Sequence, residues 1–311
     1  MRTIFFLCLF FSFSCKSSKY STVDINDKTQ LVVNENPNVI DFAALKVQEI
    51  QPLEQRMKTS RGFFTPMAGS LISLATNAVK KMIAEDKKKY TATYDMALTD
   101  MVFYDQLSTE SAFDPVGMQF NGFTVVRTFK SENGSIDTAL TARFELDKTN
   151  PYEILNNSTF RLKLKDLQLN YAKAKIAKNG PKKLNMDFEI TFKTSYVNEQ
   201  GVLFDDVTLG NFYLLLREAP LEKGAAYTEY YQKLTNKSLD GRSFIVPRSF
   251  GYYIDEEGKP AKSYSQGVYS VYVKVKESSK NAFVNTLIID NSGKIIDAAG
   301  KKLKEASEKL D

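Results

Sequence analysis

Residues 184–193 read LNMDFEITFK, and apolar and polar residues alternate along the whole stretch. Successive side chains of a β-strand point to opposite faces, so the apolar residues of this stretch share one face. They are Leu184, Met186, Phe188, Ile190 and Phe192. Alternation with one wet face is typical of an antiparallel sheet. The stretch therefore predicts a strand with one buried face, and the turn-forming NGPKK at 179–183 predicts a reversal of the chain before it.

The segment 123–147 repeats this pattern and adds a turn. It reads FTVVRTFKSENGSIDTALTARFELD, with Asn133-Gly134 between two alternating runs. Asn-Gly is the favoured pair for a tight hairpin turn with positive φ. Downstream, the alternation of Phe160, Leu162 and Leu164 continues in the opposite phase from Leu167. A change of phase predicts a β-bulge or a strand that passes from one sheet to another.

The second half is less regular. Strands are expected near four ranges, and a short helix is expected at 224–234. The strand ranges are 202–217, 243–254, 268–276 and 283–290, with hairpin turns at DEEGK (255–259) and DNSGK (290–294). The apolar run FYLLLREAP (212–220) favours a core strand covered on both faces, and the alternative is an exposed edge used for docking.

These patterns predict a mainly β protein, an antiparallel β-sandwich that is either one large unit or two consecutive ones. An apolar stripe over 66–89 predicts an N-terminal amphipathic helix packed on a sheet, with a membrane-surface helix as the alternative. A second stripe over 296–310 predicts a C-terminal helix. The expected organisation is a helix plus β-sandwich domain at 41–200 and a second β-rich region with short helices at 201–311.

Composition excludes several kinds of chemistry. The chain has 311 residues, a net charge of +5, no His, and two Cys at positions 8 and 15. Without His there is no Ser-His-Asp triad, no Cys-His pair and no His-ligated metal. The mild charge forms no basic stripe, so we expect no nucleic-acid partner. We find no cofactor-binding motif and expect no cofactor.

The first fourteen residues, MRTIFFLCLFFSFS, have the character of an export signal. The apolar run covers only about ten residues, whereas a membrane-spanning helix needs about 20. A run of this length after a basic start is typical of a signal peptide. A retained membrane anchor is the alternative.

The stretch SFSC at 12–15 resembles the lipobox of bacterial lipoproteins. Ser14 and Cys15 match that pattern, whereas Ser12 and Phe13 stand where the family usually has Leu and a small residue. The resemblance implies that Cys15 is lipidated and becomes the amino terminus, anchored in an envelope membrane (the outer rather than the inner one) and facing the periplasm or the cell surface. An exported protein without lipid is the alternative. Residues 15–40 would then be the lipidated Cys and a flexible tether with a reach of roughly 25–30 Å, or otherwise an ordinary ragged terminus.

Tyrosines are concentrated in one region. Eight of the sixteen lie between positions 227 and 272. Their flat apolar faces and polar tips suit contact with a protein or a sugar. We therefore consider a binding surface, with core and edge aromatics of a β domain as the alternative. The candidate residues are Tyr227, Tyr230, Tyr231, Tyr252, Tyr253 and Tyr264.

Adjacent carboxylates offer a weaker candidate. Asp205 and Asp206 stand beside turn formers, where oxygen ligands can hold Ca²⁺. As a glycosidase pair they are unfavourable, because strand neighbours point apart and that chemistry needs facing carboxyls. Glu110 and Asp114 meet the same objection. An ordinary turn accounts for both pairs.

Taken together, these features predict a non-enzymatic envelope module, tethered to a membrane, that binds or positions another envelope protein or polymer. The alternative is a carboxylate-dependent hydrolase of envelope glycans or polymers, since Asp, Glu, Lys, Tyr and Ser remain for catalysis.

Overall fold

The computed structural model describes residues 19–22, 25–34, 40–45, 90–101, 103–176 and 182–279. Several sequence predictions lie outside this part of the chain: the signal peptide 1–14, Cys15, the helices at 66–89 and 296–310, the strand at 283–290 and the turn at 290–294.

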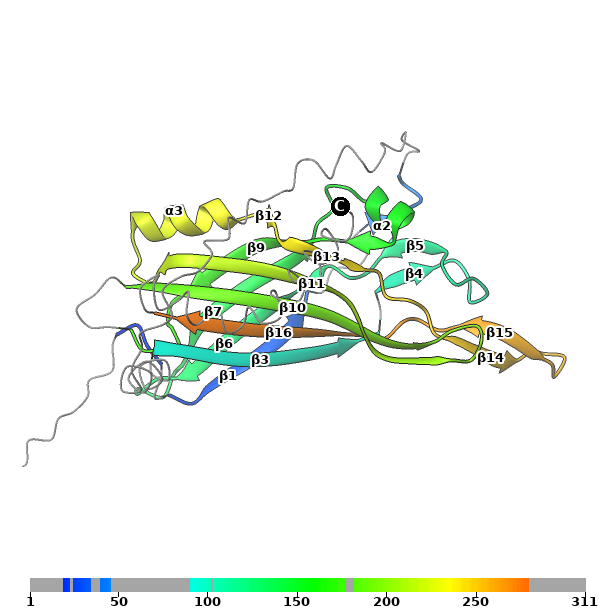
Figure 1. The fold of residues 1–311 in the computed structure, drawn as a ribbon, viewed down its shortest axis with the longest axis horizontal. Helices are drawn as coiled ribbons and strands as arrows, with labels where there is room; N and C mark the ends of the chain where they lie inside the picture. Colours follow the sequence, from blue (N-terminus) through cyan, green and yellow to red (C-terminus); the bar gives the residue numbers. More distant parts are fainter. Residues whose placement is uncertain are drawn as a thin grey trace, which may run out of the picture.

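Two antiparallel sheets form the body of the molecule (Figure 1). The first has five strands in the order β1 (Asp27–Val33), β6 (Gly122–Lys130), β7 (Ile136–Leu146), β9 (Leu162–Leu169) and β12 (Lys237–Ser238). The second has six strands in the order β3 (Thr91–Asp100), β16 (Tyr269–Ser278), β10 (Lys183–Val197), β11 (Leu203–Pro220), β13 (Asp240–Phe244) and β8 (Thr159–Phe160).

Smaller elements complete the fold. A three-stranded sheet contains β2 (Ile40–Asp41), β5 (Pro115–Met118) and β4 (Tyr104–Gln106), and a two-stranded one contains β14 (Phe250–Ile254) and β15 (Pro260–Tyr264). The described helices are α2 (Tyr152–Asn157) and α3 (Ala225–Leu234). The prediction of a mainly β, antiparallel, sandwich-like protein is confirmed, and α3 confirms the short helix expected at 224–234. No helix in the described ranges combines the length and apolar character needed to cross a membrane.

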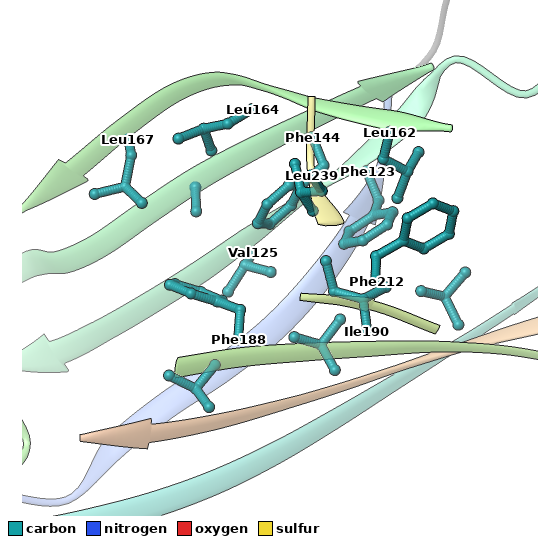
Figure 2. Packing of buried hydrophobic residues seen from close by; sticks show 14 of the residues in the cluster. Phe123, Val125, Phe144, Leu162, Leu164, Leu167, Phe188, Ile190, Phe212 and Leu239 are labelled. Atoms are coloured by element: carbon teal, nitrogen blue, oxygen red, sulfur yellow. The ribbon is translucent and has the colours of Figure 1, made fainter. Parts of the chain in front are cut away.

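The core lies between the two large sheets, and β10 is central to it. Its five predicted inward residues are all fully buried, and β10 pairs with β11 on one side and β16 on the other. Figure 2 shows Phe188 and Ile190 facing Phe123, Val125 and Phe144 from the five-stranded sheet. The rings of Phe144 and Phe188 meet edge to face with centroids 5.9 Å apart. Burial of this apolar interface is the main source of stability.

Two local predictions are confirmed with added detail. The hairpin of β6 and β7 forms, but its loop covers residues 131–135, with Gly134 alone at positive φ (+85°). The change of phase in β9 is a bulge: Leu164 pairs with Phe144 and Asp166 with Arg143, so Lys165 is the extra residue.

The expected division near 197–202 is wrong. These residues include the turn that joins β10 to β11, and strands from both sides of it belong to one six-stranded sheet. The strand β16, from the end of the described chain, lies between β3 and β10.

The stretch 212–220 is an interior strand with one buried face. Tyr213 and Leu215 are 41% and 42% exposed, so the stretch is not covered on both faces.

The expectation of a flexible tether over 15–40 is also wrong where the structure describes these residues. Residues 27–33 form β1, paired with β6 from Asp27↔Phe129 to Val33↔Phe123, and Ser21 and Thr22 are buried. Because the segment is mostly polar, apolar and polar residues do not alternate along it in the way that marks a strand. Its first inward-facing residue is Asp27, which is buried because it meets two cations.

A buried charge cluster joins the two sheets. Arg127 on β6 is fully buried; its guanidinium lies 2.8 Å from Asp27 on β1 and 3.7 Å from Glu277 on β16. Lys173 contacts Asp27 at 2.6 Å, and the Tyr94 hydroxyl on β3 donates to Glu277 at 3.0 Å. Burial alone would raise the pKa of Asp27, but hydrogen bonds from Lys173 and Arg127 lower it below its ordinary value.

The same cluster holds the start of the described chain. Arg127 donates to the Thr22 hydroxyl at 2.9 Å, and the Thr22 amide donates to the carbonyl of Ala172 at 2.8 Å. Glu277 accepts backbone hydrogen bonds from residues 173 and 174 at 2.6 and 2.9 Å. Because the members of the cluster bond to one another and to the backbone, we assign it a structural role.

Candidate binding surface

Two hairpins and a loop meet at one end of the molecule (Figure 1). The turn of the β10–β11 hairpin lies beside the β14–β15 hairpin, because the Val197 amide donates to the Ser249 hydroxyl at 3.0 Å. The loop between β4 and β5 joins them, since the Tyr264 amide donates to the Thr109 carbonyl at 2.7 Å. We call residues 105–114, 196–206 and 248–264 the hairpin end.

The β14–β15 hairpin is specified locally by its turn. Asp255 pairs through its backbone with Lys259, and its side chain accepts from the amides of Glu257 and Lys259 at 3.0 and 2.8 Å. Gly258 adopts φ +78°, a conformation that glycine reaches without steric cost. The turn predicted at 255–259 is therefore confirmed.

A two-stranded hairpin is marginally stable alone in water, so its anchors matter. Phe250 and Tyr264 stand opposite each other, are both buried, and pack with ring centroids 5.3 Å apart. The Tyr264 hydroxyl donates to Glu199 in the β10–β11 turn. This hydrogen bond to Glu199 raises the pKa of Tyr264 above its ordinary value.

Arg248 fixes the base of the same hairpin. Its side chain is 2% exposed and donates to four backbone carbonyls. Two of these belong to Ser108 and Ser111 in the β4–β5 loop, and two to Tyr264 and Ser265 at the end of β15. Arg248 thus joins two segments that are distant in sequence, and it ties the β14–β15 hairpin to the β4–β5 loop.

An open depression of about 540 Å³ lies next to this clamp. Its lining is mostly polar and includes Leu107, Thr109, Ser263 and Gln266. Asp105, which also lines it, accepts a hydrogen bond from Gln119. Asp105 is the only carboxylate among its lining residues, so the depression holds no pair of facing carboxyls.

Exposed apolar side chains gather at the hairpin end. Seven of the sixteen exposed large apolar residues in the described chain belong to it, although it holds fewer than one in five of the described residues. They are Leu107 (80%), Val202 (50%), Leu203 (63%), Phe204 (38%), Tyr252 (66%), Tyr253 (46%) and Ile254 (68%). Such a concentration on a surface marks an interaction site more often than chance exposure.

The structure separates the six predicted tyrosines into two groups. Tyr252 and Tyr253 are exposed on β14, and Tyr264 is the buried anchor of the same hairpin. The other three lie on α3, away from the hairpin end.

The tyrosines of α3 attach that helix to the sandwich. Tyr227 and Tyr231 are buried with ring centroids 4.4 Å apart. Burial raises the pKa of Tyr231 above its ordinary value. The Tyr230 hydroxyl donates to the carbonyl of Arg217 at 3.0 Å. These contacts are those of packing residues.

The carboxylate candidates bind different partners. Asp205 accepts from the Ser195 hydroxyl at 2.7 Å, and Asp206, at φ +50°, pairs with Lys193 at 2.5 Å. Asp114 accepts from Ser108. Within the described ranges, no three acidic, His or Cys side chains are placed to share a metal ion.

The remaining members of the hairpin end were not predicted. Val202, Leu203 and Phe204 follow the turn as three consecutive apolar residues, and neighbours in a strand point to opposite faces, so one face exposes an apolar side chain unless both faces are covered. This apolar run was therefore a signal, present in the sequence, of an exposed apolar side chain at 202–204. No local pattern points to Arg248, because two of its four carbonyl partners, Ser108 and Ser111, lie about 140 residues away.

Comparison with protein-family models, curated proteins and solved structures gives no match for this chain. Its function is therefore inferred from its own residues.

Proposed function

We propose that the chain is a non-enzymatic binding or scaffold module of the bacterial envelope. It is held on a membrane through lipid on Cys15, and the hairpin end is its contact surface. The observation that carries this proposal is the set of seven exposed apolar side chains at the hairpin end, six on two mutually braced hairpins and Leu107 on the adjoining loop. Apolar groups on a pre-ordered element bind without a large ordering cost.

The hydrolase alternative lacks comparable support. That chemistry needs two carboxyls facing each other across a cleft, about 5–9.5 Å apart. The depression beside Arg248 has one carboxylate in its lining, that of Asp105. The signal-like residues 1–14 and Cys15 support the location, and they supply a separate test.

Contact is tested by a photo-crosslinking amino acid at position 252 of the full chain in intact cells. The matched control is position 136, where Ile136 is 76% exposed. Ile136 pairs with Lys130, close to the Arg127–Glu277 contact, and so lies at the opposite end of the sandwich from the β10–β11 turn. We expect a discrete adduct from position 252 that is lost when Leu203 and Ile254 are both changed to Ser. Equal adducts from positions 252 and 136 would refute the proposal.

Location is tested by incorporation of labelled fatty acid into the wild type and into Cys15→Ala, followed by membrane fractionation. Label is expected in the wild type alone. Label in neither protein, with both in the soluble fraction, would remove the anchor.

A further inference from the structure

The hairpin end carries a charge opposite to that of the rest of the chain. Its three segments contain nine carboxylates and three basic side chains, a net formal charge of −6. The whole chain carries +5, so the remaining residues together carry +11. The exposed apolar residues and the negative charge therefore occupy the same surface.

Most of this negative charge is not neutralised by ion pairs. Only Asp114, Asp206 and Glu257 have a cationic partner within 4 Å in the described structure. The others are held by neutral donors, as Glu199 is by Tyr264 and Asp255 by backbone amides, or they extend into solvent. The carboxylates without a cation are Asp105, Glu110, Glu199, Asp205, Asp255 and Glu256.

This combination selects the partner by its chemistry. Anionic lipid headgroups and nucleic-acid phosphates would be repelled by a surface of this charge. A neutral apolar partner would gain nothing from six unpaired carboxylates, and would leave some of them desolvated at a cost. A polypeptide that presents apolar side chains within a Lys- and Arg-rich surface satisfies both features, because complementary potentials guide association and set specificity.

We infer that the hairpin end docks a basic polypeptide surface with exposed apolar side chains. This inference rests on the proposed function, and it adds the class of partner. Carboxylates at the rim direct the encounter, while Tyr252, Ile254 and Leu203 supply the apolar contact.

Salt and charge dependence test the inference. Isolated envelopes carrying the full chain with the crosslinking residue at position 253 are irradiated at 50 and 500 mM NaCl. The screening length falls from about 14 Å to about 4 Å over this range. We expect the adduct yield to fall at least about threefold at high salt, and to fall similarly at 50 mM salt in the double variant Asp205→Asn, Glu256→Gln.

The matched control is the double variant Glu132→Gln, Asp137→Asn in the β6–β7 hairpin, which removes the same charge from the opposite end and should leave the yield unchanged. Mass spectrometry of the adduct should place the crosslink in a Lys- or Arg-rich segment of the partner. An adduct whose yield responds to neither salt nor the charge variants would overturn the inference and leave the proposed function in place. Absence of any adduct from positions 252 and 253 would overturn both.

Discussion

The buried glutamate of the charge cluster gives a sharp test of how the two sheets are held together. Glu277 is fully buried, and both of its carboxylate oxygens are occupied. One accepts from the Tyr94 hydroxyl and faces Arg127; the other accepts from the amides of Lys173 and Ala174 at 2.6 and 2.9 Å. In Glu277→Gln the shape is kept but the charge is lost, and one acceptor becomes an NH₂ group.

Neither orientation of that amide suits the site. If the NH₂ group faces residues 173 and 174, it meets two N–H donors. If it faces Arg127, it meets a guanidinium. Removing one partner of a buried ion pair costs about 3–5 kcal/mol, and here the variant leaves Asp27 as the one carboxylate of the cluster for two cations, Arg127 and Lys173. For a domain of 150–250 residues, this corresponds to a fall in Tm of about 6–20 °C.

The assay is thermal unfolding followed by circular dichroism at pH 7 for the wild type, Glu277→Gln and a matched control. The control is Glu218→Gln, which removes the same charge from an exposed ion pair with Lys183. Exposed pairs contribute little to stability, so its Tm should stay near that of the wild type. Equal Tm values for the two variants would refute the view that the cluster holds the sheets together.

Three further predictions concern other sites. Because hydrogen bonds lower the pKa of Asp27 in the folded state, its contribution to stability is complete at neutral pH and is lost as pH falls below about 4. Asp27→Asn should therefore lower the Tm at pH 7, and the Tm of the variant should decline less on acidification than that of the wild type. Parallel Tm–pH curves for the two proteins would contradict this. Gly122→Ala places a Cβ 2.1 Å from a backbone oxygen at φ +111°, whereas the Cβ of Gly201→Ala, at φ +74°, meets open space. In urea unfolding, the free energy of unfolding should fall by at least about 3 kcal/mol for the first variant and by about 1 kcal/mol for the second. Arg248→Met should accelerate amide hydrogen exchange in 249–265 while β10 stays protected, and unchanged exchange there would mean that Arg248 does not hold the hairpin.

The parts of the fold that could be predicted are those whose evidence is local. Alternation in β10 reports a strand and its buried face within ten residues, and the bulge at Lys165 appears as a change of phase. By contrast, β1 could not be recognised, because its inward Asp27 is stable only beside Arg127 and Lys173, about 100 and 146 residues away. From the sequence alone, a charged residue is taken to be solvent-exposed unless its buried partner is known.

The candidate site shows a second limit. Tyr252 and Tyr264 are the same residue type on the same hairpin and the same face of the ribbon, yet one is 66% exposed and the other 8%. In a sheet packed on a core, alternation separates a dry face from a wet one. A two-stranded ribbon that projects from the sandwich has no such face of its own, and only the part nearest its base is covered. Which tyrosine is buried thus depends on where the ribbon leaves the sandwich, and Arg248 and the β10–β11 turn determine that point.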